Sequence, residues 1–452
     1  MRLQIRTGTE GSPVGSAEDR KRPSRSRVLI VLTAAIAIRI LWVAYCCTNG
    51  AVFNDSHPFA AGEMGRIATN LAANRGFSSP FGMGSQPTAW ESPLVPYFFS
   101  LVMKACGGAS MRAAATVLYI QAVIGGFGAW LYWLVVRRLV HRNAGRIAVW
   151  VSPVVAVLVC IWPESVVETV DLWYYVWQEA FLALLLFALL LWREQSNHRR
   201  AAIAGICGGV LALISVTPVP AAVILMTMVG LSSPRRDYRP ALTAGLCFAV
   251  VIAPWLVRNS MVFHAFVPLR SNAGYEIFQG NNAIECIREP VNAPHPATDA
   301  NQYRLYQQMG EIRYSRYCLS LAASYVRAHP LQTAYRIGVR AYVVWLTDLT
   351  DHWAPSNSTR WWQRSALHKS LVVVSSGLIL LAALSFWWGV IRGRFARLPH
   401  AAGFGVLLVL LPLPHYITLA DPEYTTTFRM LVAITSVCMI GVLPAVRHKW
   451  MR

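Results

Sequence analysis

A series of apolar runs, each near the length that crosses a bilayer, limits what this chain can fold into. A helix needs about 20 apolar residues to cross the hydrocarbon core of a membrane. Only 14 % of the 452 residues are charged, whereas soluble domains carry about 25 %. This excludes an ordinary soluble enzyme, and the many aromatic residues exclude a disordered chain. We predict an all-α polytopic membrane protein with ten spans, at 28–46, 113–136, 147–163, 174–192, 201–216, 217–231, 240–257, 366–390, 399–417 and 425–446.

Basic residues gather in every second segment between these runs. If each run crosses once, six segments fall on one side and hold 23 Lys and Arg against five Asp and Glu. By the positive-inside rule this side is the cytoplasm, so both termini are predicted to be cytoplasmic. The net charge of +20 then reflects topology, and no nucleic-acid partner is expected. The six segments are 1–27, 137–146, 193–200, 232–239, 391–397 and 447–452.

The predicted topology divides the chain into four parts. They are a disordered basic tail at 1–27, a membrane core at 28–257 with a first outer loop at 47–112, an outer segment at 258–365, and C-terminal membrane helices with a short cytoplasmic tail at 366–452. Apolar spacing predicts short helices at 63–73 and 93–106 on the outer membrane surface. Two more outer helices are predicted within 302–350, broken at Ala328-His329-Pro330.

The first outer loop carries three acids, Asp55, Glu63 and Glu91, and a loop of this length is often functional. Glu63 begins the predicted helix three residues before Arg66. That spacing permits an ion pair, which would keep a general base ionised. Structural alternatives remain open. Asp55 lies in a turn-forming sequence, Glu91 stands where a carboxylate favours a helix N-terminus, and any of the three could be a solvated surface acid.

Two arginines follow the seventh apolar run. Arg258 stands at its outer end, and Arg270 follows an extended aromatic stretch. Guanidinium groups bind phosphate with two parallel hydrogen bonds, so both are candidate ligands of a lipid phosphate; the alternative is interfacial snorkelling. The polar residues beyond them could hydrogen-bond a sugar or simply form turns. The candidate substrate-binding residues are Trp90, Asn272, Tyr275, Glu276, Asn281, Tyr424 and Arg429.

One further acid, Glu179, lies about a turn inside the fourth run. An intramembrane carboxylate is a functional hypothesis, with Arg39 or Arg429 as its partner; a purely structural buried pair is the alternative. The nine Cys form no CxxC pair and no cluster with His, so the sequence predicts no metal site. We expect no obligatory cofactor, although nothing in the sequence excludes a divalent cation.

Five stretches that span nearly the whole chain carry a more specific signal. They are EMGRIATNLAANRGFSSPF, TAWESPLVPYF, PWLVRNSMVFHAFVPLRSNAGYEIFQGNN, MGEIRY and the turn at 424–429. Taken in order, they resemble the GT-C superfamily of membrane glycosyltransferases. The closest branch is similar to the bacterial relatives of the protein mannosyltransferases and to the lipid A aminoarabinose transferases.

The resemblance implies an outward-facing cavity that accepts a polyprenyl-phosphate sugar, with an acid of the first outer loop as general base. Carried over residue by residue, Glu63 matches that acid, and Glu91 matches the acid of the family's Glu-x-Pro stretch. Arg258 matches a basic residue near the carrier phosphate. The sequence departs from the aminoarabinose-transferase-like branch where an Asp-Glu pair opens the loop, because Ala60-Ala61 stands there.

Asp55 therefore remains a rival to Glu63 as the base. The expected function is transfer of a hexosyl or pentosyl group from a lipid-phosphate donor to a lipid, glycan or protein acceptor, at the outer face of an inner membrane whose lipids surround the protein. The alternative is a lipid or saccharide transporter. A transporter would place coupling carboxylates near mid-membrane, whereas most acids here lie in the outer segments.

Overall fold

The computed structural model describes residues 25–48, 58–60, 62–82, 85–141, 148–232, 237–284, 294–346, 366–398, 400–420 and 422–447. Most of these residues are helical, and the described chain contains one isolated β-bridge, between Ser78 and Pro87. The predicted all-α class is thus confirmed. The predicted tail at 1–27 lies outside the described residues except for its last three, which begin α1.

The chain up to residue 263 contains the helices of the first outer loop and the first set of apolar helices. In chain order they are α1 (Arg25–Thr48), α2 (Glu63–Ala72), α3 (Leu94–Ala105), α4 (Met111–His141), α5 (Ala148–Ile161), α6 (Pro163–Val167), η2 (Glu168–Val170), α7 (Tyr175–Glu194), α8 (His198–Ile214), α9 (Val219–Leu231) and α10 (Arg239–Phe263).

The second half adds the outer segment and the last apolar helices. These are α11 (Ala273–Gly280), α12 (Ala300–Met309), α13 (Glu311–Ala328), α14 (Pro330–Leu346), α15 (Ala366–Ile391), η5 (Phe395–Arg397), α16 (Ala401–Leu410), α17 (Leu413–Ile417) and α18 (Pro422–Arg447).

Within the residues that the structure describes, six stretches of helix are long and apolar enough to cross a membrane. They are Ser26–Thr48, Met111–Val140, Trp150–Val170, Tyr175–Glu194, Arg239–Phe263 and Val373–Ile391, and shorter apolar helices lie at Val219–Leu231, Ala401–Ile417 and Thr425–Ile440. These helices coincide with predicted apolar runs, so the polytopic architecture is confirmed. The count of ten crossings remains a prediction, because several helices are shorter than a span.

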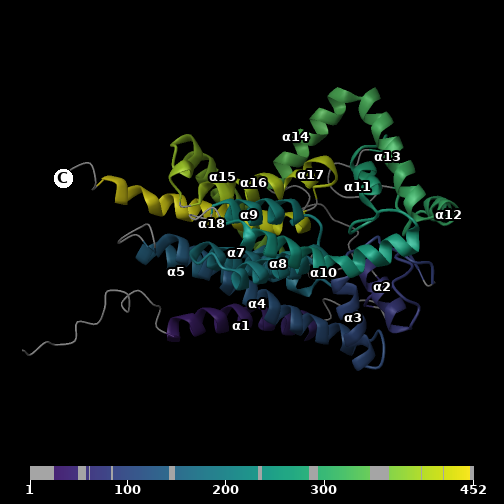
Figure 1. Cartoon of the computed structure of the whole chain (residues 1–452), viewed down its shortest axis with the longest axis horizontal. Coiled ribbons are helices and arrows are strands. Elements are labelled where there is room, and N and C mark those ends of the chain that lie inside the picture. The colour runs from purple at the N-terminus through teal and green to yellow at the C-terminus, as the bar shows by residue number, and fades with distance from the viewer. Residues whose placement is uncertain are drawn as a thin grey trace, which may run out of the picture.

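The long helices lie side by side, and the outer-loop helices gather at one end of them (Figure 1). α2, α3, α11, α12 and α13 lie at that end, whereas the start of α1 and the end of α18 lie at the opposite end. α4 packs against α1, α5 and α7. Gly128 of α4 lets the backbone of α7 approach closely, since a Cβ at this position would meet Ala180.

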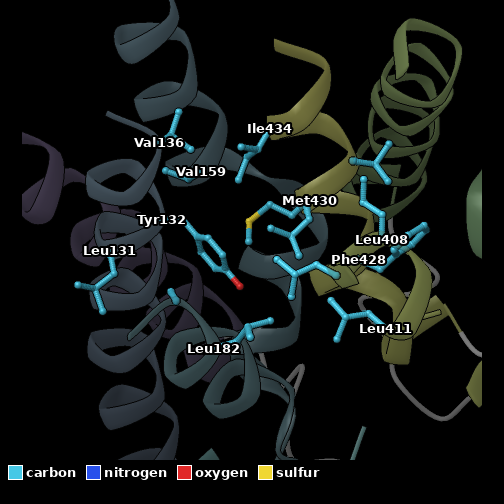
Figure 2. Packing of buried hydrophobic residues seen from close by; sticks show 14 of the residues in the cluster. Leu131, Tyr132, Val136, Val159, Leu182, Leu408, Leu411, Phe428, Met430 and Ile434 are labelled. Carbon is cyan, nitrogen blue, oxygen red and sulfur yellow. The ribbon is translucent and has the colours of Figure 1, made fainter. Parts of the chain in front are cut away.

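The main core is formed where helices distant in the sequence meet. Figure 2 shows Tyr132 of α4 directed toward Met430 of α18, with Leu182 of α7 nearby. A second buried cluster joins α2 and α3 to α4 and to the start of α7. The first outer loop is therefore packed onto the membrane helices, which gives it a fixed position.

One prediction for the outer segment is corrected. The break at Ala328-His329-Pro330 is confirmed, since α13 ends at Ala328 and α14 begins at Pro330. The described part of this region, 302–346, nevertheless holds residues of three helices, α12, α13 and α14, instead of two, because Gly310 also breaks the chain. Its φ of 74° lies in the left-handed region, which glycine adopts at little cost.

Candidate active site

The short helix α2 places Glu63 at the edge of the first outer loop. Its apolar residues Met64, Ile67 and Leu71 are buried, which fixes the orientation of the helix and leaves Glu63 in the first turn, where a carboxylate is favoured. Gly65 permits the close approach of the preceding chain, since a Cβ there would meet the carbonyl of Phe59. The predicted helix at 63–73 is thus confirmed to within one residue.

The partner of Glu63 is His295, from the outer segment. The His295 Nε2 lies 3.1 Å from Glu63 Oε1, and the two side chains are 17 % and 16 % exposed. His295 Nδ1 accepts a hydrogen bond of 2.9 Å from the backbone N–H of Ala297. A nitrogen that accepts carries no proton, so the ring presents its Nε2–H to Glu63 even when it is neutral.

This arrangement keeps Glu63 ionised. Burial raises the pKa of Glu63, but the hydrogen bond and electrostatic attraction of the His295 ring, a backbone hydrogen bond and the nearby Arg66 together hold that pKa below its ordinary value. The predicted pairing with Arg66 is found only as this electrostatic influence. Arg66 Nε instead donates to the carbonyl of Ala60, at 2.9 Å.

The surroundings of Glu91 raise its pKa, whereas those of Glu63 lower the pKa of Glu63. The Glu91 side chain is 3 % exposed and lies 2.8 Å from Arg270 Nη2. Burial nevertheless outweighs the attraction of Arg270, and together with the neighbouring Glu63, Glu276 and Glu311 it raises the pKa of Glu91 to about 8. Two carboxyl groups of one loop, Glu63 and Glu91, thus have pKa values moved in opposite directions, which is the pattern of an acid–base pair.

Arg270 connects the loop to α11. Its Nε donates to the carbonyl of Trp90 at 2.8 Å, and its Nη2 also lies 3.7 Å from Glu276, whose side chain is 37 % exposed. Asn272 donates to Glu276 at 2.6 Å. The structure therefore brings Arg270, Asn272 and Glu276 together with Glu91.

Glu311 is a buried residue of this site that sequence reasoning missed. Its carboxylate accepts hydrogen bonds from Thr88 Oγ1 at 2.5 Å, the N–H of Ala89 at 2.7 Å, Ser271 Oγ at 2.5 Å and Tyr306 OH at 2.8 Å. It therefore ties the first outer loop, the chain before α11 and the end of α12 to the start of α13. Glu311 lies within MGEIRY, one of the stretches that carry the family resemblance, but the sequence alone indicated no function for this residue.

Arg258 is engaged by the backbone of the first loop. Its Nη1 donates to the carbonyl of Thr88 at 2.6 Å and its Nη2 to the carbonyl of Phe77 at 3.0 Å. The guanidinium also lies 4.9 Å from the ring centre of Trp255, a cation–π distance. These contacts hold the loop against α10.

The predicted sugar-binding aromatic residues lie beneath the charged group. Trp90 and Tyr275 are 2 % and 1 % exposed, and they pack with Tyr306 and Tyr314 in one aromatic cluster. Asn281 is also buried, and it donates to the carbonyls of Ile277 and Ile417, each at 2.8 Å. In this structure Trp90, Tyr275 and Asn281 are buried and contact other residues of the protein.

Arg429 has its own set of partners, distinct from those of Glu63. It donates to Glu164 of α6 at 2.5 Å and to the carbonyls of Val343 and Val344. The side chain of Tyr424 and all of Asp55 lie outside the described residues. The described part of the chain holds no group of three or more His, Cys, Asp or Glu that could bind a metal ion.

Part of the chain matches a known protein family. Residues 95–291, less than half of the chain, match the model of glycosyltransferase family 87. No curated protein matches significantly. Among solved structures, the apo crystal structure of an oligosaccharyltransferase from Archaeoglobus fulgidus matches with 15 % identity and a TM-score of 0.49, over 94 % of this chain and 52 % of the archaeal chain. The chain thus spans about half the length of that protein.

The family match supports the predicted resemblance to a membrane glycosyltransferase of the GT-C type. The matched range includes Arg258, Arg270 and α11. Glu63 and Glu91 lie before it, so their roles depend on the geometry of the site.

Proposed function

We propose that this protein transfers a sugar from a polyprenyl-phosphate-linked donor to a lipid, glycan or protein acceptor at the outer face of the membrane, with Glu63 as general base. One observation carries the proposal: Glu63 is partly accessible and lies 3.1 Å from His295, at the end of the molecule where the outer-loop helices gather. These contacts hold the pKa of Glu63 below its ordinary value, as a general base requires. An inner-membrane location with both termini in the cytoplasm forms part of the same proposal.

In the proposed reaction the acceptor hydroxyl gives its proton to Glu63 as its oxygen attacks the anomeric carbon of the sugar. The bond between that carbon and the phosphate oxygen breaks, and polyprenyl phosphate leaves with the electron pair. A positioned general base typically contributes about 10²–10⁴-fold to the rate, and a cation near the departing phosphate stabilises its developing charge.

We assign the contact with the phosphate to Arg270 in preference to Arg258. The side chain of Arg270 is 13 % exposed, and its contact with Glu276 is loose at 3.7 Å. A phosphate could replace Glu276 at that position and gain a charge-assisted contact. Arg270 would keep its bonds to the carbonyl of Trp90 and to Glu91 while the phosphate takes the place of Glu276. In Arg258, by contrast, both Nη1 and Nη2 are bound to carbonyls of the loop, and a phosphate would have to break those bonds.

The test is turnover by the purified protein in nanodiscs, with a donor identified beforehand. A strain that lacks the gene should accumulate the polyprenyl-phosphate sugar, which lipid mass spectrometry can name. Glu63→Gln should then lose about 10²–10⁴-fold in transfer rate while it still binds this donor. Glu194→Gln is the matched control and should retain turnover. Glu194 is the last residue of α7, whereas the start of α7 packs against the first outer loop.

Asp55 is the alternative base within the same proposal. Near-normal turnover in Glu63→Gln together with inactive Asp55→Asn would move the role to Asp55. Near-normal turnover in both variants would exclude Glu63 and Asp55 as the base.

A transporter is the competing function, and Glu179 is the residue on which it would depend. Glu179 accepts a hydrogen bond of 2.8 Å from Ser165, and Ser165 accepts one of 2.8 Å from Arg39. Its partner is therefore Arg39 through Ser165, whereas Arg429 pairs with Glu164. This fixed, buried arrangement supports a structural role for Glu179, and donor-dependent product formation in nanodiscs would separate the two functions.

A further inference from the structure

Helix α14 has its charges inside and its apolar side chains outside. Its only charged residues, Arg336 and Arg340, are 2 % and 0 % exposed. The outward residues Leu331, Tyr335 and Tyr342 are 85 %, 64 % and 51 % exposed. A helix that contacts water shows the reverse pattern. The exposed face of α14 is therefore more stable against an apolar environment than in water.

The two inward arginines are held by carbonyl oxygens at helix ends. Arg336 donates to the carbonyl of Asn282 at 2.8 Å, just beyond α11. Arg340 donates to the carbonyl of Gly280 at the end of α11, and to those of Tyr416 and Ile417 in α17 at 3.2 and 3.3 Å. Such carbonyls have no partner within their own helix and attract cations. Both arginines are therefore committed to the protein interior.

The preceding helix α13 is amphipathic, with a polar face that is exposed. Arg313, Arg316, Ser320, Ser324 and Arg327 follow one another at intervals of three and four residues, so they form one stripe along the helix. A basic stripe of this kind, beside a helix with an apolar face, is the pattern of a segment that lies in a membrane interface.

The position of the hairpin formed by α13 and α14 agrees with this pattern. It projects from the bundle at the end where the outer-loop helices gather (Figure 1). α14 packs against α15, α17 and α18, and α15 is a candidate span whose side chains Val374, Leu381 and Leu384 are exposed by 54–62 %. The apolar face of α14 thus adjoins a helix whose exposed face is itself suited to lipid.

We propose that the outward face of α14 contacts the acyl chains of the outer leaflet, with the arginine stripe of α13 at the level of the lipid head groups. The partner is the lipid bilayer. Through Arg336 and Arg340 this lipid-embedded helix would hold the end of α11, the helix that carries Glu276 of the candidate site. The membrane contact does not depend on the proposed transferase activity.

The test uses the full-length protein in nanodiscs whose lipids carry a diazirine on the acyl chain. After illumination, lipid adducts are quantified for each tryptic peptide by mass spectrometry, and hydroxyl-radical footprinting on a second sample reports water contact. Peptide 328–336 contains Leu331 and Tyr335, and peptide 305–313 from α12 and the start of α13 is the matched control. We expect acyl-chain adducts on 328–336 with little hydroxylation, and the reverse on 305–313.

A variant makes the assignment specific to the apolar face. The double substitution Leu331→Asp and Tyr335→Asp should remove most lipid adducts from the same region, whereas Gln307→Asp in α12 should leave them unchanged. If 328–336 in the wild type is hydroxylated as strongly as 305–313 and carries no lipid adduct, the face contacts water and the proposal fails. If it shows neither modification, protein covers it and the proposal also fails.

Discussion

At the scale of single residues, the hydrogen bond between His295 and Glu63 can be tested by its effect on the pH dependence of turnover. His295→Ala removes the donor while burial of Glu63 persists, so the pKa of Glu63 should rise. Because a hydrogen bond to a charged group contributes about 1.5–3 kcal/mol, the acidic limb of the kcat/KM profile should move up by about one to two pH units.

The control for this prediction is the conservative variant His295→Gln, whose amide can donate to Glu63 and should shift the profile less. Turnover of His295→Ala should approach the wild-type value at high pH, where Glu63 is again ionised. A loss of equal size at every pH would show that His295 acts on the structure of the loop and does not set the ionisation of Glu63.

Arg258 and Arg270 should differ in what their removal changes. Arg258→Ala leaves the buried carbonyls of Phe77 and Thr88 without their donor, and each unsatisfied group costs about 1–3 kcal/mol. We expect a lower thermal unfolding temperature and a loosened first loop. Arg270→Lys keeps the charge but loses the two-bond geometry, so it should chiefly raise the KM for the donor. If Arg258→Ala unfolds at the wild-type temperature but has a raised KM for the donor, Arg258 and not Arg270 binds the phosphate.

At the scale of helices, the contact between α11 and α13 depends on a glycine. A Cβ on Gly274 would overlap the carbonyl oxygen of Ser315, and the N–H of Gly274 bonds Ser315 Oγ at 3.2 Å. Gly274→Ala should therefore push α11 from α13 and lower stability by about 1–3 kcal/mol, as overpacking typically does. Because α11 carries Glu276, turnover should fall as well.

The measurement is thermal unfolding of purified protein together with transfer activity. Gly338→Ala in α14 is the matched control, since a Cβ there meets no atom within 4 Å and alanine favours a helix. If Gly274→Ala were as stable and as active as Gly338→Ala, the close packing of α11 on α13 would not matter for the site.

Helices could be predicted from the sequence where neighbouring residues along the chain determine them. An apolar run of sufficient length has few alternatives to a helix in a membrane, and Pro330 starts a new helix because proline lacks the N–H that a continuing helix needs. The break at Gly310 was missed, because a glycine inside a helical pattern is often tolerated. Here its left-handed backbone separates α12 from α13.

The partners of the site residues were less predictable, because they come from distant parts of the chain. Sequence spacing pointed to Arg66 as the partner of Glu63, but packing brings His295 there instead. Thr88 and Glu311 are 223 residues apart and still share a hydrogen bond. Periodicity reports which face of a helix is buried, but it contains no information on which distant segment covers that face.

At the scale of the whole molecule, the positions of the basic segments predict which end faces the cytoplasm. The basic segments predicted to be cytoplasmic include 193–200 and 391–397, and the positive-inside rule concerns short loops of this kind. The start of α1 and the end of α18 lie at the end of the molecule opposite to α2, α3 and α11 (Figure 1). One orientation therefore puts the candidate site outside and the basic loops inside.

Cysteine labelling in intact cells tests this orientation. Ser196→Cys and Ala396→Cys lie in the two basic segments at exposed positions, and Gln307→Cys is exposed on α12. We expect a membrane-impermeant maleimide to label Gln307→Cys from outside, while the other two react only after the membrane is permeabilised. The parent protein measures the background from its native cysteines. External labelling of Ser196→Cys or Ala396→Cys would reverse the topology and place Glu63 in the cytoplasm, where a donor on the outer leaflet could not reach it.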